Sequence, residues 1–456
     1  MRIVLWHGWL LEGSGSNIAT ARVAEVLRAA GHDVLLLCQE RHPERYPWID
    51  AVGAVGPDGV AISAAETGGT SAGRCVLLRP DIGPLLPVFV IDAYEGFATV
   101  KTFLELTPDE LDTYLARNVD ALRTAAEWHE SEVAIAGHAI PGAAVARRAL
   151  GEGAYITKVH GSDVEYALRP QLRYRDLAGE GLRAARAVIG PSADVLARLT
   201  ALVPGVERLG RILPPGVDAG RFRPQPRRKA LLEAAGRLDA EAATIAGGRP
   251  EGLDAEVAHA LADRDAEALD ALARRYDQAM PDTTAASTLR AVAERDLPLV
   301  GYFGKLIPQK GVELLLQAAR ATETDPDVLV VGFGLHREWL TALRLALAGE
   351  GLAWLEGTGR LALDPQPGPG QAGRDGIVSF TGRLDHRFAP GVLAAMDVLV
   401  VPSILEEAFG MVAAEGAAAG ALPLVARHSG LAEVASALER EVGVPDLFSF
   451  EPGPRA

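Results

Sequence analysis

The first forty residues have the order strand, loop, helix, strand, and this order constrains the fold more than any other feature. Arg2 to Trp6 is a short apolar run that predicts a buried strand. A loop rich in Gly and Ser follows, then apolar residues recur at helical spacing over 23–30, and a second apolar run starts at Val34. Parallel strands need a helical crossover between them, so the order predicts a doubly wound α/β sheet.

The same rhythm begins again at residue 299. Further short apolar runs predict strands at 88–91, 133–136, 154–159 and 187–190 in the first half, and at 299–303, 328–332, 377–381, 398–401 and 422–426 in the second. Between the halves, residues 225–296 are rich in Ala, Glu, Asp and Arg, with helical apolar spacing. We therefore predict an N-terminal Rossmann-like domain at 1–224, a helical insertion or linker at 225–296, and a C-terminal Rossmann-like domain at 297–456. The insertion is either a mobile cap or an inert surface decoration.

Composition excludes several classes of function. The net charge of -15 makes broad nucleic-acid binding improbable. Cys38 and Cys75 form no CxxC pair, so we expect neither a structural metal nor a disulfide framework. The first residues lack a cleavage-type pattern, and no apolar run reaches the length of a membrane span. These features favour the cytoplasm.

One small basic patch is compatible with a peripheral location at the inner membrane surface. It consists of Arg169, Arg173 and Arg175 around Tyr174. The alternative is a solvated face, which we favour because the patch is small.

The loop after the first strand is the first candidate site. Gly13, Gly15 and Ser16 lie where backbone N–H groups can approach a phosphate or an acceptor at a helix N-terminus. The spacing is not that of a dinucleotide site. A tight turn with Ser16 or Asn17 as the helix N-cap explains the loop equally well.

The second candidate site follows the first strand of the second half. Lys305 and Lys310 lie in a strand-to-helix loop, at the carboxyl edge where α/β sheets bind ligands. Two lysines there can neutralise a diphosphate, including the charge that grows on a departing one. Solvated surface lysines are the alternative.

The third candidate site follows the strand at 398–401. Glu407 and Glu415 suit the recognition of sugar or ribose hydroxyls, which donate hydrogen bonds to carboxylates. The N–H groups of Gly410, Met411 and Val412 can hold a sugar phosphate at the start of the next helix. In the alternative, Glu407 only stabilises the helix start and Glu415 is solvated.

Several motifs together resemble the family-4 retaining glycosyltransferases of the GT-B fold, also described as glycosyl transferases group 1. The resemblance covers most of residues 296–434 and, more loosely, residues 1–222; the insertion has no counterpart in it. The motifs are Gly-Lys-Leu-x3-Lys-Gly at 304–311, Phe-Thr-Gly-Arg at 380–383, Asp397 to Ser403, Glu407-x7-Glu415, Ser-Gly-Leu-x-Glu at 429–433, and Pro-Pro-Gly-Val-Asp at 214–218 with Arg221 and Phe222.

The resemblance implies two Rossmann-like domains with parallel sheets that face each other across a cleft, and it implies roles for the donor-site residues. Glu407 would contact the donor sugar and Glu415 the nucleotide ribose. Lys305 and Lys310 would grip the diphosphate in place of the family's usual Arg and Lys, and Lys lacks the bidentate fork of Arg. The backbone near Arg383 would meet the base.

The resemblance also implies a histidine in the first domain that faces the reacting sugar. His160, in the segment Lys158 to Asp163, is similar to that residue, and His138 is the second choice. Without the resemblance, His160 is a hydrogen-bonded histidine at a strand end, and Asp163 caps a helix.

The predicted reaction is the transfer of a hexose from a UDP- or GDP-sugar to an unidentified acceptor, with retained anomeric configuration. The acceptor is a small molecule, a lipid-linked molecule or a glycan. We expect front-face transfer without a metal or a further cofactor, since no residue stands out as a nucleophile, and we expect His160, Glu407 and Lys310 to be catalytic. The alternatives are a nucleotide-sugar epimerase and a sugar-nucleotide binding protein without activity.

Two points stay open at this stage. The sequence predicts neither the oligomeric state nor the base, the sugar and the acceptor. Family members normally continue past the Ser-Gly-Leu-x-Glu segment with more α/β structure, whereas this chain ends at Ala456. The chain is thus either a fragment or a protein with an unusual tail.

Overall fold

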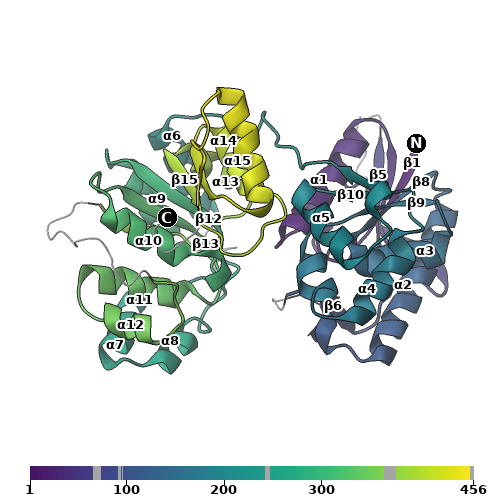
Figure 1. The fold of residues 1–456 in the computed structure, drawn as a ribbon, viewed down its shortest axis with the longest axis horizontal. Helices are drawn as coiled ribbons and strands as arrows, with labels where there is room; N and C mark the ends of the chain where they lie inside the picture. Colours follow the sequence, from purple (N-terminus) through teal and green to yellow (C-terminus); the bar gives the residue numbers. More distant parts are fainter. Residues whose placement is uncertain (65–72, 91–93, 95, 242–246, 364–375, 452–456) are drawn as a thin grey trace. The chain divides into compact units, whose positions relative to one another are not determined.

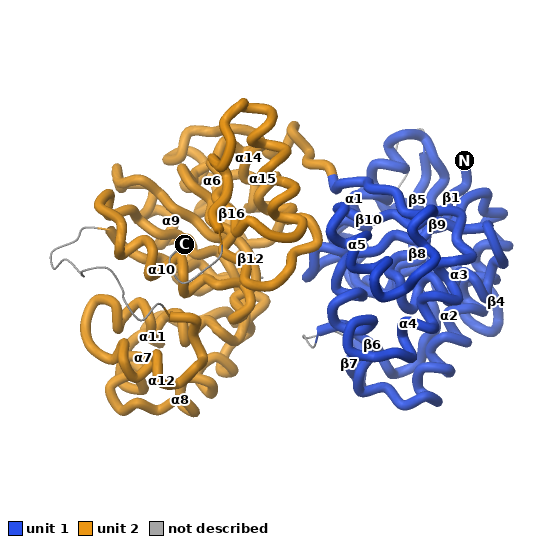
Figure 2. Tube along the Cα trace, in the orientation of Figure 1, with its two compact units in different colours: residues 1–215 blue, residues 216–456 orange. Residues whose placement is uncertain are grey.

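The computed structural model of the protein describes residues 1–64, 73–90, 94, 96–241, 247–363 and 376–451. The chain forms two compact units, residues 1–215 and 216–456 (Figure 2). Each unit has a mainly parallel sheet with helices packed on it (Figure 1). The predicted α/β fold class with two Rossmann-like units is confirmed.

The sheet of the first unit has the strand order β11-β10-β9-β8-β1-β2-β5-β3-β4. Its pairs are parallel except for β3 with β4. The strands are β1 (Arg2–Trp6), β2 (Asp33–Leu37), β3 (Ala51–Gly56), β4 (Gly59–Ala64), β5 (Arg74–Pro80), β8 (Val133–Gly137), β9 (Tyr155–Lys158), β10 (Ala187–Gly190) and β11 (Gly210–Ile212). The helices are α1 (Gly15–Ala29), α2 (Pro108–Trp128), α3 (Ala143–Leu150), α4 (Leu172–Leu182) and α5 (Ala193–Leu202).

The predicted strand at 88–91 does not belong to this sheet. β6 (Leu85–Val88) pairs instead with β7 (Thr99–Thr102) in a separate two-stranded sheet, and residue 91 lies outside the described residues. The interpretation also missed β3, β4 and β5. Of these, β5 is a run of buried apolar residues in the sheet interior, between β2 and β3, so it carried the same signal as the strands that were found.

The start of α1 corrects one detail of the predicted glycine loop. Neither Ser16 nor Asn17 is the N-cap; Ser14 is, and its side chain accepts a hydrogen bond from the Asn17 N–H at 3.3 Å. Ser14 has the extended backbone that an N-cap requires, whereas the next residues already have helical dihedrals.

The sheet of the second unit is parallel throughout, with the order β14-β13-β12-β15-β16-β17. All five strands predicted for this half are present. The strands are β12 (Leu299–Lys305), β13 (Asp327–Phe333), β14 (Val378–Phe380), β15 (Val398–Val401), β16 (Leu422–Ala426) and β17 (Ser449–Phe450). The helices are α6 (Arg227–Ala240), α7 (Leu253–Asp263), α8 (Ala266–Leu272), α9 (Ala285–Ala293), α10 (Val312–Ala321), α11 (Arg337–Ala348), α12 (Leu352–Gly357), α13 (Ala389–Ala394), α14 (Met411–Ala419) and α15 (Ser429–Val442).

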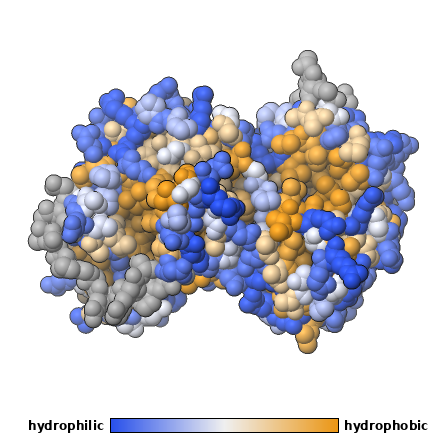
Figure 3. Space-filling view, turned by 45° about the horizontal axis from the view of Figure 1, so that its top comes forward, coloured by the Kyte–Doolittle hydropathy of each residue, from blue (hydrophilic) through white to orange (hydrophobic). Residues whose placement is uncertain are grey.

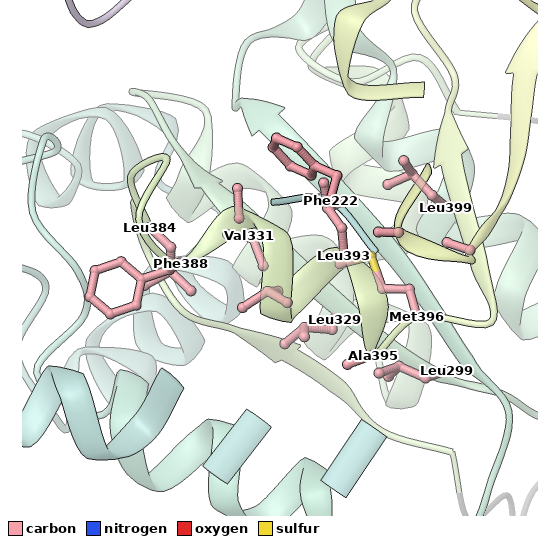
Figure 4. Packing of buried hydrophobic residues seen from close by; sticks show 14 of the residues in the cluster. Phe222, Leu299, Leu329, Val331, Leu384, Phe388, Leu393, Ala395, Met396 and Leu399 are labelled. Atoms are coloured by element: carbon pink, nitrogen blue, oxygen red, sulfur yellow. The ribbon is translucent and has the colours of Figure 1, made fainter. Parts of the chain in front are cut away.

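Successive residues along the strands of this sheet belong alternately to two apolar clusters. Leu329 and Val331 of β13 belong to one cluster, while Val328 and Val330 belong to the other. This alternation is expected because successive side chains of a strand point to opposite faces of the sheet. Figure 4 shows the first cluster, in which strand side chains such as Leu329 pack with Leu393 of α13. The sheet is therefore buried on both faces.

The helices of the predicted insertion build part of both clusters. Leu231 of α6 and Leu289 of α9 are buried in the first cluster, and Val257 of α7 and Leu269 of α8 are buried in the second. Phe222, which precedes α6, is also in the first cluster. These described helices are thus structural parts of the second unit, and residues 216–224 go with them.

No helix in the described parts of the chain is both long and apolar enough to cross a bilayer. The cytoplasmic location and the alternative peripheral place at a membrane stay predictions from the sequence.

Replacing Leu289 by Ala should lower the free energy of unfolding of the second unit by about 2–5 kcal/mol, because the lost methyl groups leave a cavity in the core. Denaturant unfolding followed by tryptophan fluorescence measures this change. The control is Leu335→Ala, since Leu335 is 54% exposed; its effect should stay below about 0.5 kcal/mol. Equal, small effects of both variants would contradict the assignment of α9 to the core.

Candidate functional site

The strand order of the second unit reverses beside β12. From β12 the chain runs to β13 and β14 on one side, and β15 and β16 continue on the other side. In open α/β sheets, ligands bind outside the carboxyl ends of the strands at such a reversal. Lys305 ends β12, Lys310 lies in the turn that follows, and Glu407 lies in the loop after β15. The predicted diphosphate and sugar residues thus flank the reversal point.

Lys310 and Glu407 meet across this point. The Lys310 ammonium group donates a hydrogen bond to Glu407 Oε1, and both side chains are about three-quarters buried. Ser403 Oγ donates to the same oxygen at 2.8 Å, and the Glu407 N–H donates to Ser429 Oγ at 2.9 Å. These contacts fix the Glu407 carboxylate and leave its Oε2 atom as a further acceptor.

His428 contacts both of the serines that bind Glu407. Its Nε2 lies 2.7 Å from the Ser403 carbonyl oxygen, which can only accept, so Nε2 carries the proton. Its Nδ1 lies 3.0 Å from Ser429 Oγ and can accept from that hydroxyl. The sequence interpretation gave no role to Ser403, His428 or Ser429. Their signal was the position of each after β15 or β16, at the same edge of the sheet.

Two glycines allow the loops of this edge to approach closely. Gly311 has φ +63°, and a Cβ there would lie 2.3 Å from the Pro402 carbonyl oxygen. Gly410 precedes α14 with φ +98°, and a Cβ there would lie 2.5 Å from Leu431. Gly410, Met411 and Val412 form the start of α14, where first-turn N–H groups point out of the helix. This end of the helix has the geometry and partial charge of an anion site.

Lys305 and Arg383 both approach one aromatic ring, that of Phe333. The Lys305 Nζ is 5.5 Å from the centre of the Phe333 ring, and the Arg383 guanidinium carbon is 5.2 Å from it. Phe333 ends β13, and Arg383 follows β14. Three neighbouring strands therefore contribute to one cationic and aromatic surface.

Glu415 is buried in α14 and pairs with a histidine. Its Oε1 lies 3.1 Å from His386 Nε2. The Arg221 guanidinium donates to the His386 carbonyl oxygen at 3.0 Å, and the Phe222 ring lies edge-on to the His386 ring. Glu415 is thus held in place by His386 and buried, which excludes the alternative that it is a solvated surface residue.

In the first unit the strand order reverses between β1 and β8, and histidines gather at the carboxyl ends of these strands. His7 follows β1, His138 follows β8, and His160 follows β9 after one residue. The ring centres of His138 and His160 are 4.4 Å apart, and those of His7 and His138 are 5.8 Å apart. The sequence interpretation missed His7, although its place directly after the first strand marks the same edge.

These three histidines are neutral at pH 7. Burial lowers the pKa of His7 to about 4 and lowers those of His138 and His160 well below the ordinary value. Burial also lowers the pKa of the neighbouring Lys158 to about 8. Among the residues that the structure describes, His138 Nδ1 and His160 Nε2 are buried without a hydrogen-bond partner. Neutral imidazole nitrogens of this kind can accept a proton or bind a hydroxyl.

Asp163 ties the loops after β8 and β9 together. Its carboxylate is fully buried and accepts from the N–H groups of Ala139 at 2.6 Å and Gly161 at 2.9 Å. Burial raises its pKa although these bonds oppose the shift. His138, the first residue of the loop after β8, has φ +71°, a backbone conformation rarely taken by residues other than glycine. Asp163 thus does more than cap a helix; it holds His138 and His160 in place.

The glycine loop is joined to the histidine cluster through Asn17. The Asn17 amide donates to the Glu12 carbonyl oxygen at 2.6 Å, and its Oδ1 lies 2.9 Å from His7 Nε2. A Cβ at Gly13 or Gly15 would meet nothing within 4 Å. Packing therefore does not require these glycines, and with Ser16 they stay a predicted acceptor or phosphate loop.

The described residues contain no group of three or more His, Cys, Asp or Glu side chains that could hold a metal ion.

The neutral histidines predict a loss of stability in acid. Below a pH of about 6.5 the unfolded chain binds protons that the buried imidazoles cannot bind, so the free energy of unfolding falls as the pH drops from there toward the lowered pKa. In His138→Asn one of these imidazoles is gone, and Asn tolerates the positive φ of this position. The slope of the free energy of unfolding against pH should therefore become smaller by up to about 1.4 kcal/mol per pH unit. Chemical unfolding at pH 6.5, 5.5 and 5.0 measures the slope.

The control for this slope is His259→Asn, because the His259 side chain is 81% exposed. Its slope should equal that of the unsubstituted protein. A slope unchanged in His138→Asn as well would contradict the neutral, buried state of that imidazole.

Residues 297–447 match the profile of the family described as glycosyl transferases group 1. A search of curated protein sequences found no match. The chain is similar in structure to sucrose-phosphate synthase from Thermosynechococcus elongatus, with 19% identity, a TM-score of 0.55, and coverage of 100% of this chain and 87% of that one.

Two further solved structures are similar to nearly the whole chain. The Anabaena protein HepE in complex with UDP-glucose has 15% identity and a TM-score of 0.54, with coverage of 99% of this chain and 86% of that one. The catalytic domain of starch synthase IV from Arabidopsis thaliana, bound to ADP and acarbose, has 13% identity and a TM-score of 0.55, with coverage of 99% and 88%. The fold is therefore GT-B, and the match of residues 297–447 to the profile of glycosyl transferases group 1 confirms the predicted enzyme class, a glycosyltransferase.

Proposed function

We propose that the protein transfers a hexosyl group from a nucleoside diphosphate sugar to a hydroxyl of an acceptor, with retention at the anomeric carbon. The observation that carries this proposal is the contact of Lys310 with Glu407 at the strand reversal of the second unit. It sets a cation for phosphate beside a carboxylate for sugar hydroxyls. HepE, which is similar in fold, was crystallised with UDP-glucose, so a UDP-sugar is the first donor to test beside a GDP-sugar.

The donor would be held by three groups of residues. Lys305, Lys310 and the first N–H groups of α14 would bind the diphosphate. The contacts of the Glu407 side chain with Lys310 and Ser403 go to Oε1. Its Oε2 atom would therefore accept hydrogen bonds from the sugar. Glu415 would bind the ribose.

The chemical step needs stabilised charge on the leaving group. The bond between the anomeric carbon and the β-phosphate oxygen breaks, and a bond from the acceptor oxygen forms on the same face of the sugar. The acceptor proton passes to an oxygen of the departing diphosphate. Lys305, Lys310 and the α14 dipole stabilise the growing negative charge, and we propose that no metal ion is needed for this.

The acceptor side is assigned to the first unit. The neutral His138 and His160 offer nitrogen atoms that can accept a hydrogen bond from a hydroxyl. Apolar residues also gather on the face of the first unit that Figure 3 presents. An acceptor with an apolar part suits such a surface, so a lipid-linked acceptor is kept beside glycans and small molecules.

Two other functions use the same site. An epimerase would convert a nucleotide sugar without any acceptor, and a binding protein would hold it without turnover. Incubation with UDP- and GDP-glucose, followed by separate measurement of free diphosphate, epimer and glycoside, distinguishes the three functions.

Glu407→Gln should lower kcat/KM about 10- to 100-fold, the value of one charge-assisted hydrogen bond. A coupled assay of released nucleoside diphosphate measures it. The control is Glu406→Gln, because Glu406 is the exposed neighbour in the same loop, and it should keep the unsubstituted rate. Equal rates of both variants would reject the role of Glu407.

Retention makes a separate prediction about the product. With an α-linked donor sugar, the new glycosidic bond should also be α, because the acceptor attacks the face that the diphosphate leaves. The coupling constant of the anomeric proton in the NMR spectrum of the product identifies the linkage. A β-linked product would reject the front-face mechanism and leave the transfer reaction itself intact.

A further inference from the structure

A segment of the insertion, Gln278 to Asp282, lies against the loops that carry Phe333 and Arg383. Pro281 forms an antiparallel bridge with Gly382, directly before Arg383. The Asp282 N–H donates to the Thr381 carbonyl oxygen at 2.8 Å. The insertion therefore extends the carboxyl edge of the sheet beyond β14, at the place where the nucleotide base is expected.

The segment holds Arg383 through its backbone and its side chain. The Arg383 N–H donates to the Met280 carbonyl oxygen at 3.3 Å, and its Nη1 lies 3.5 Å from the Ala279 carbonyl oxygen. Gln278 Oε1 accepts from the Gly334 N–H at 3.3 Å, next to Phe333. The segment thus joins the loop after β13 to the loop after β14.

Buried ion pairs fix the insertion to the body of the unit. Asp282 pairs with Arg337 at 3.1 Å, and both side chains are only 6% exposed. Arg249 binds both carboxylate oxygens of Glu338, which is fully buried. Removing one partner of such a pair leaves a buried charge without compensation, so the pairs hold the segment in one position.

We infer that the segment Gln278 to Asp282 forms one wall of the nucleoside site and positions Arg383 for selection of the base. Phe333 and Arg383 supply the planar groups on which a base stacks, while the segment sets where the guanidinium lies. This inference rests on the proposed function, because it needs a nucleoside diphosphate donor. Arg383 contacts the base and the segment positions Arg383, whereas Lys305 and Lys310 bind the diphosphate.

Gly382→Ala tests the inference directly. A Cβ at Gly382 would lie 2.5 Å from the N and Oδ1 atoms of Asp282, so the substitution pushes the segment away from the Arg383 loop. Gly359→Ala is the matched control: Gly359 has φ +63° against φ +69° at Gly382, but a Cβ there meets nothing within 4 Å. Both variants place Ala at a similar positive φ, and only Gly382→Ala carries the collision.

The measurement is calorimetric binding of UDP, GDP, ADP and inorganic pyrophosphate to the full chain. In Gly382→Ala we expect the preferred nucleoside diphosphate to bind about tenfold more weakly, the size of one lost stacking contact. The ratios among the three nucleotides should move toward one, and pyrophosphate should bind as before. The KM for the donor should rise with kcat unchanged, because the contact acts on binding alone. Gly359→Ala should bind all four ligands like the unsubstituted protein.

A second variant keeps the test decisive if Gly382→Ala does not fold. Gln278→Ala removes the half-buried side chain that accepts from the Gly334 N–H and donates to the Ala273 carbonyl oxygen, and it should weaken binding of nucleoside diphosphates about threefold with pyrophosphate binding unchanged. Unaltered nucleotide binding in the folded variants would overturn the inference. So would an equal loss for nucleotides and pyrophosphate, which marks a merely structural role. An unsubstituted protein that binds none of the nucleotides would instead refute the proposed function.

Discussion

The contact of Lys310 with Glu407 connects the two halves of the second sheet at the point where its strand order reverses. Lys310 comes from the turn after β12 and Glu407 from the loop after β15. Gly311 lets these two segments touch, since any side chain there would collide with the Pro402 carbonyl oxygen. The parallel sheet brings the segments to one edge, and the backbone approach then sets the distance between cation and carboxylate. The donor site that we propose depends on both.

The two units differ in the charge of the groups at the carboxyl edge of their sheets. In the second unit, Lys305, Lys310 and a helix N-terminus offer positive charge to an anion. In the first unit, burial keeps the imidazoles of His7, His138 and His160 neutral. Such a difference suits a charged donor and an uncharged hydroxyl acceptor, because a diphosphate binds to cations, whereas a neutral imidazole nitrogen accepts a hydrogen bond from a hydroxyl.

The insertion changes how the second unit should be understood. Its helices α6 and α9 lie in one apolar cluster and α7 and α8 in the other, so it is not a separate decoration. The same residues that anchor it, through Arg249 and Asp282, also hold the segment beside Arg383. Stability of the unit and shape of the proposed base site are therefore linked through one stretch of chain.

Local patterns in the sequence determined the strands β12 to β16, the α/β class, and the position of Lys305, Lys310 and Glu407 at or just after the carboxyl ends of strands. Such patterns suffice because apolar periodicity and loop position are properties of neighbouring residues. Only the tertiary structure decided which distant groups meet: Glu407 with Lys310 and Ser429, and His7 with His138. It also decided that the insertion enters the core. These outcomes follow from strand order and from packing between residues far apart in the chain, which single-sequence periodicity does not encode.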